Sequence, residues 1–116
     1  MTLNDFHREM ASYRLSAEDE AKSLKDPYVT LERLRTLYKK FDSAEKQMAD
    51  QVLSEWALSE DEGIRFDALT LIREFEISTA VAALRELVIR LTSSTAPGAS
   101  YELNKVFRIM AQLEAM

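Results

Sequence analysis

Apolar residues recur at intervals of three and four along most of the chain, which is the spacing of one face of an α-helix. The first stripe contains Leu3, Phe6, Met10 and Tyr13. A weaker stripe follows over residues 16 to 25, where we expect Ser16 to cap a second, short helix. Residues 1 to 25 are therefore predicted to form N-terminal helices that cap the rest of the chain.

Start and stop signals divide the remaining sequence into further helices. Asp26-Pro27 predicts a helix to about Phe41, because aspartate is a good cap and proline is tolerated in the first turn. Ser43 is expected to cap a helix through about Leu58. Ser59 and Glu62 fit a capping box for the next helix, which is expected to run to about residue 75.

The C-terminal part is predicted to contain two more helices. Ile77-Ser78 is a tight connection into a helix that ends near Thr92. The segment 93 to 99 contains Pro97-Gly98 and is predicted to be a loop. The last helix, from about residue 100, is expected to bury Leu103, Val106, Ile109, Met110 and Leu113.

These helices recur as pairs with similar apolar positions, at a shift of about 35 residues, which lies in the range of helical solenoids. The matched positions are Val29 with Ile64, Leu31 with Phe66, Leu34 with Leu69, Leu37 with Ile72, Val52 with Leu87, Leu53 with Val88 and Trp56 with Leu91. At a shift of 37, Leu103, Val106 and Ile109 match Phe66, Leu69 and Ile72. The sequence thus predicts one domain, 1–116, with units at 27–58 and 59–92 and a half unit at 97–116.

The second unit resembles the HEAT-like repeats in an acidic turn, an aliphatic-Arg pair, a small residue and a leucine: Asp61, Ile64-Arg65, Ala68 and Leu69. The resemblance is best over residues 61–91 and weaker over 27–58 and 97–113. The first unit departs from it, with Thr30 in place of the arginine and Arg33 in place of the small residue.

What the resemblance implies is a short right-handed solenoid of about two and a half helical hairpins. The aspartate and arginine would be structural and bridge neighbouring units, and the second helices would line a concave face. An ordinary antiparallel helical bundle is the alternative, because amphipathic helices joined by short turns also generate apparent repeats. Both arrangements are all-α, in agreement with a composition of only two Gly and two Pro.

Little in the sequence indicates catalysis. Cysteine is absent, and the single histidine, His7, lacks the spacing of a zinc or di-iron site. The consecutive acids 18–20 and 60–62 do not converge on one point and suit helix starts. We therefore expect a protein that is not an enzyme and needs no metal or cofactor, with a small enzyme using a pocket between helices as a distant alternative.

Charge is uneven along the chain, whose net charge is −5. Residues 1 to 62 carry 14 acidic and 9 basic side chains, whereas residues 63 to 116 carry six of each. Such a chain favours a basic partner and disfavours nucleic acid and anionic membranes. With no signal-peptide pattern and no apolar run of about 20 residues, it is expected to be soluble and cytoplasmic.

A partner surface is predicted on the exposed side of the second helices. It comprises Gln47, Asp50, Gln51, Ser54, Glu55, Arg85, Glu86, Ile89 and Arg90. Ile89, an aliphatic residue between charged neighbours, is either a small binding hot spot or an extra core residue. Trp56 is expected in the core, because it aligns with Leu91.

The leading hypothesis is a non-enzymatic module that binds a basic protein through this face. One specific version is an immunity protein or antitoxin that neutralises a basic toxin. A structural homo-oligomer, such as a homodimer, is the other alternative, since two and a half units are few for a solenoid and one end is then left uncovered.

Overall fold

The structure, a computed structural model, describes residues 2–115. The helices are α1 (Leu3–Leu24), α2 (Val29–Lys40), α3 (Ser43–Trp56), α4 (Glu62–Glu74), α5 (Val81–Thr92) and α6 (Ala99–Glu114), with a 3-10 turn at Ser78–Ala80 before α5. No strand occurs among the described residues, which confirms the all-α prediction. None of the described helices is long and apolar enough to cross a membrane. The chain forms two compact units that divide between Val52 and Leu53, within α3.

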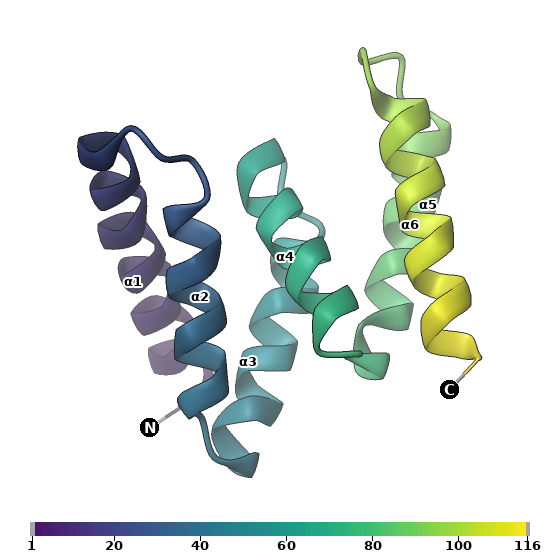
Figure 1. Ribbon diagram of the computed structural model, residues 1–116. Coiled ribbons are helices and arrows are strands. Elements are labelled where there is room, and N and C mark those ends of the chain that lie inside the picture. Colours follow the sequence, from purple (N-terminus) through teal and green to yellow (C-terminus); the bar gives the residue numbers. More distant parts are fainter. Residues whose placement is uncertain (1, 116) are drawn as a thin grey trace. The chain divides into compact units, whose positions relative to one another are not determined.

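In the first unit, α1 and α2 pack side by side (Figure 1). Their shared core contains Phe6, Met10, Ala17, Ala21, Leu31, Leu34 and Tyr38. The rings of Phe6 and Phe41 lie 5.1 Å apart. On the surface, the Arg33 guanidinium donates to the Glu20 carboxylate at 3.1 Å and lowers the pKa of that carboxyl, so an ion pair also joins the two helices.

The prediction of two short helices before residue 25 is wrong, because α1 is continuous from Leu3 to Leu24. Ser16 is exposed within the helix and caps nothing, and the ion pair of Arg14 with Glu18 (2.9 Å) spans the predicted break. The stripe of Phe6 and Met10 continues through the small buried residues Ala17 and Ala21, with no Gly or Pro to stop it.

Aspartates rather than serines cap the following helices. Asp42 and Glu45 form a reciprocal capping box before α3 (2.8 and 3.1 Å), although Ser43 was the predicted cap. The Asp61 carboxylate accepts from the Ile64 amide at 3.1 Å and caps α4. The capping box predicted between Ser59 and Glu62 does not form in this turn, all of whose residues the structure describes. The Ser59 hydroxyl instead accepts from the Asp61 amide. Serine and aspartate cap about equally well, so their position in the turn decides between them.

The start of α2 also differs from the prediction. The Asp26 carboxylate accepts from the Tyr28 amide at 3.0 Å and forms a turn, and the helix begins only at Val29. The later boundaries agree with the prediction: α5 ends at Thr92, and α6 begins at Ala99, one residue before the expected start. Gly98 precedes α6 with a φ of 82°, a left-handed conformation that glycine adopts without strain.

The second unit is built on α4, α5 and α6, with α6 packed against both α5 and α4 (Figure 1). Its core contains Leu53, Trp56, Leu69, Ile72, Leu84, Leu87, Val106 and Ile109. Trp56 is only 7% exposed, which confirms its predicted place in the core. Arg65 pairs with Glu102 near the starts of α4 and α6, and the Gln112 amide donates to the Arg73 carbonyl near their ends. The helices α4 and α6 therefore run side by side in the same direction.

Candidate functional site

The predicted partner-binding residues of α5 are all exposed: Arg85, Glu86, Ile89 and Arg90. The side of α5 that carries Leu84, Leu87 and Leu91 is buried in the second unit. Ile89 is 68% exposed, so the interpretation of this residue as an extra core residue is wrong. The other interpretation, a small binding hot spot that a partner would cover, agrees with an exposed aliphatic side chain among charged neighbours.

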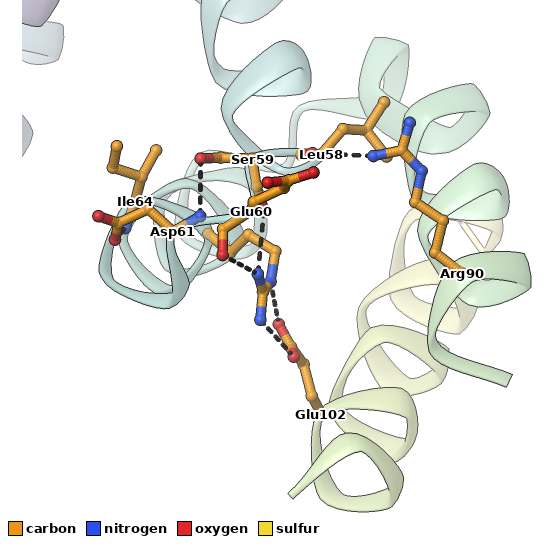
Figure 2. Close-up of polar contacts among 8 residues, drawn as sticks. Leu58, Ser59, Glu60, Asp61, Ile64, Arg90 and Glu102 are labelled. Atoms are coloured by element: carbon orange, nitrogen blue, oxygen red, sulfur yellow. Dashed lines mark hydrogen bonds and ion pairs between the residues drawn. The ribbon is translucent and has the colours of Figure 1, made fainter. Parts of the chain in front are cut away.

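The three charged residues of this set on α5 already have contacts within the second unit. The Arg90 guanidinium donates to the Leu58 carbonyl at 2.9 Å (Figure 2). It also pairs with the Glu86 carboxylate at 2.9 Å. Arg85 lies 3.6 Å from the Glu114 carboxylate of α6. Arg90 therefore joins α5 to the connection after α3, and replacing it would change the fold as well as the surface.

The predicted residues of α3 belong to different units and differ in exposure. Gln47 and Gln51 are exposed and Asp50 is half-buried in the first unit. Ser54, half-buried, and Glu55, exposed, belong to the second unit. Among the α3 acids, Glu55 is thus the better candidate for contact with a partner.

Asp50 has an internal hydrogen-bond partner. The Tyr38 hydroxyl donates to its carboxylate at 2.8 Å, and the Lys46 ammonium lies 5.6 Å from the centre of the Tyr38 ring. Burial raises the pKa of Asp50, against the opposing effects of the Tyr38 hydrogen bond and the Lys46 charge. This carboxylate thus supports the packing of α2 on α3 within the first unit.

Replacing Asp50 by asparagine is expected to leave the chain at least as stable as wild type at pH 7. A carboxyl whose pKa is raised on folding stabilises the fold most below its ordinary pKa of 3.8, and this contribution is lost as the pH rises through the folded pKa. Asparagine keeps an acceptor for Tyr38 without the buried charge. Urea unfolding at pH 3 and pH 7 should therefore favour the variant more at pH 7. A variant clearly less stable than wild type at pH 7 would contradict this account.

A groove lies between α4 and α6 in the second unit. Its volume is about 910 Å³. The lining includes Phe66, Leu69 and Arg73 from α4 and Tyr101, Lys105 and Arg108 from α6. Tyr101 is 80% exposed, and the sequence alone did not predict the groove.

One end of this groove is fixed by Arg65. Its guanidinium donates to both carboxylate oxygens of Glu102, at 2.7 and 3.1 Å, and to the carbonyls of Ser59 and Glu60, at 3.0 and 3.1 Å (Figure 2). The Arg65 and Glu102 side chains are only 13% and 22% exposed. The Glu102 carboxylate raises the pKa of Arg65, so the pair remains charged and holds α4 against α6.

The other cations of the groove lack such partners. The Lys105 ammonium lies 4.2 Å from the centre of the Phe66 ring, and burial, followed by the nearby Arg73 charge, lowers the pKa of Lys105. Arg73 and Arg108 are exposed. Within residues 2–115, none of Arg73, Lys105 and Arg108 forms an ion pair.

Phe66 explains why the sequence did not reveal this groove. The repeat alignment matched it with Leu31 as an apolar position and did not show its exposure: Phe66 is 47% exposed, whereas Leu31 is buried. A usable signal was present: residues 66 and 73 of α4 and residues 101, 105 and 108 of α6 follow helical spacing on sides that are not the main apolar stripes.

No protein-family model matches the chain, and neither do the curated proteins or the solved structures with which it was compared. Residues 2–115 contain no group of three His, Cys, Asp or Glu side chains placed to hold a metal ion. The surfaces described above are therefore the basis for a proposal about function.

Proposed function

We propose that the chain is a non-enzymatic protein-interaction module that binds a basic protein through exposed residues of the second unit, on α5 and on the part of α3 that begins at Leu53. The observation that supports this proposal is the 68% exposure of Ile89 on an otherwise charged helix face. An exposed aliphatic residue gains free energy when a partner covers it, and charged neighbours around it contribute specificity more than affinity.

The negative net charge of the chain supports the proposal that the partner is basic. The chain carries a net charge of −5, and Glu55 and Glu86 are exposed acids on α3 and α5. A surface of this sign attracts basic proteins at long range and raises their association rate. A basic toxin neutralised by this chain would be one such partner.

The HEAT-like arrangement is part of the same proposal. Its support is the parallel course of α4 and α6, which would be the first helices of successive units, together with the Arg65–Glu102 pair between them. In such an arrangement the second helices, α3 and α5, supply the binding face.

Ile89→Asp is expected to abolish capture of a basic partner from native lysate without lowering the thermal stability of the chain. The reason is that Ile89 contributes almost no buried area to the fold but would lie at the centre of the interface. Affinity capture with quantitative mass spectrometry measures the loss, and circular dichroism measures stability.

Leu15→Asp is the matched control, since Leu15 is a 62% exposed aliphatic residue on α1 of the first unit. The control should retain every partner that wild type retains. Equal capture by wild type and Ile89→Asp, or equal losses by both variants, would overturn the proposed face.

A homo-oligomer is the second candidate, supported by an apolar stripe on α6. Phe107 is 49% exposed, and Leu103 and Met110, one turn before and after it, are half-buried. A second copy that packed on this stripe would cover it. Light scattering separates the candidates, because a concentration-independent monomer mass would exclude the oligomer and a dimer mass would support it.

A further inference from the structure

We propose that the groove between α4 and α6 is a second docking site, which binds an acidic segment of a partner protein that also carries large apolar side chains. The proposal does not depend on the α5 face, because it concerns other residues and the opposite charge. Its basis is the juxtaposition of unpaired cations with exposed aromatic rings in one groove.

The groove has an apolar floor and partly exposed aromatic walls. Leu69 and Ile109 line it and are almost fully buried, while Phe66 and Tyr101 are 47% and 80% exposed. A volume of about 910 Å³ lies near the upper end of the range for small-molecule pockets. This space accommodates several side chains of a peptide that lies along the two helices, and covering the aromatic rings would favour its binding.

The charge of the groove favours an acidic peptide over a basic one. Arg73, Lys105 and Arg108 line the groove, and none of them has an ion-pair partner among residues 2–115. Two acids also line it, but Glu102 is already paired with Arg65, and Glu62 lies at the start of α4, about 16 Å along the helix from Arg73. The end of the groove toward Arg73 and Arg108 is therefore cationic.

Lys105 strengthens the case for an anionic ligand. Its ammonium is half-buried over the Phe66 ring and is repelled by Arg73, and burial and this repulsion together lower its pKa. A carboxylate placed between Lys105 and Arg73 would offset both effects. The nearby Glu102 and Asp67 charges act in the opposite direction on the pKa of Lys105, but Glu102 is already paired with Arg65. An added carboxylate from a peptide would therefore still improve the surroundings of Lys105 and Arg73.

An acidic peptide fits better than a nucleic acid. The whole chain has a net charge of −5, which repels a polyanion at long range, whereas a short peptide carries few charges. Three unpaired cations are also few for a backbone that carries a charge at every nucleotide. The exposed rings instead suit leucine or aromatic side chains placed between the acids of a peptide.

The test is selection of displayed random peptides of about 12 residues, long enough to follow three helical turns, on the immobilised wild-type chain. Enriched peptides are then synthesised with a fluorescent label and titrated by anisotropy. The variants are Arg108→Glu and Tyr101→Ala, both at exposed positions of α6, and the matched control is Arg85→Glu on α5.

We expect enriched peptides to combine Asp or Glu with Leu, Phe or Trp. Their affinity should fall about tenfold or more with Arg108→Glu, because one favourable charge pair becomes a repulsive one. Tyr101→Ala should weaken binding by a smaller factor, and Arg85→Glu should leave it unchanged. Added salt should weaken the binding of the acidic peptides to wild type.

Three results would overturn the proposal: no enrichment of acidic peptides, equal binding to wild type and Arg108→Glu, or an oligothymidylate of about 15 nucleotides that binds the groove more tightly than any peptide. The last would assign the groove to nucleic acid. Ile89→Asp should leave peptide binding intact, so this proposal and the α5 face can each fail without the other.

Discussion

Replacing Arg65 by alanine is expected to lower the free energy of unfolding of the second unit by about 3 kcal/mol, the scale for breaking a buried ion pair from one side. The change removes four hydrogen bonds: two to the Glu102 carboxylate and one each to the carbonyls of Ser59 and Glu60. Glu102, with a side chain only 22% exposed, would keep its charge without a partner.

The single tryptophan provides the measurement. Trp56 lies in the core of the second unit and is 7% exposed, so its fluorescence should report on the unit that contains Arg65 as urea unfolds it. Arg65→Lys should fall between alanine and wild type, because lysine keeps the charge but lacks the planar fork that binds both carboxylate oxygens.

Arg8→Ala is the matched control for this experiment. The Arg8–Asp5 pair on α1 also has an N–O distance of about 3 Å, but its side chains are 79% and 48% exposed. Loss of such a surface pair should change stability by no more than about 0.5 kcal/mol. A loss below about 1 kcal/mol for Arg65→Ala would contradict the role given to Arg65.

Arg65 also shows which part of the structure could be predicted from the sequence and which part could not. Resemblance to HEAT-like repeats implied a structural arginine that bridges neighbouring units, but it did not name Glu102 as the partner. That partner lies on another helix, and the packing of α6 beside α4 selects it. The helices themselves were predictable because each carries an apolar stripe, which is a local property of the sequence.

The helix caps are also a local property of the sequence, but their signal was ambiguous. Asp42 stands beside Ser43, and Ser59 lies two residues before Asp61. Serine and aspartate have similar capping preferences, so only the backbone path decides which side chain reaches the free amide. For α1, the weak stripe after Tyr13 suggested a break, but small buried alanines pack against α2 as well as larger residues would.

The groove was beyond prediction for a third reason. Its cations lie on two helices that are separated in the sequence by the whole of α5, and nothing in either helix alone indicates that they share a groove. Phe66 shows the same limit, because the match of Phe66 with Leu31 indicates that an apolar residue recurs but not which side of the helix it occupies. Surfaces formed by two helices depend on long-range packing, whereas stripes on one helix do not.

Leu84→Ala is expected to lower the stability of the second unit by about 3 kcal/mol, the usual scale for leucine truncation in a well-packed core. Leu84 has no exposed surface and lies on the inner side of α5. Ile89→Ala, on the same helix, should change stability by no more than about 0.5 kcal/mol, because the removed atoms are already in water. Urea unfolding followed by Trp56 fluorescence compares the two variants directly.

The comparison of Leu84→Ala with Ile89→Ala is needed to interpret the binding experiments. If Leu84→Ala destabilises the unit and Ile89→Ala does not, α5 has one side that holds the fold and one that is available to a partner. A loss of binding in Ile89→Asp then comes from the surface and not from unfolding. If Ile89→Ala instead lowered the free energy of unfolding by more than about 1 kcal/mol, Ile89 would be packed against other residues in solution. The exposure of Ile89, which supports the proposed interface, would then be contradicted.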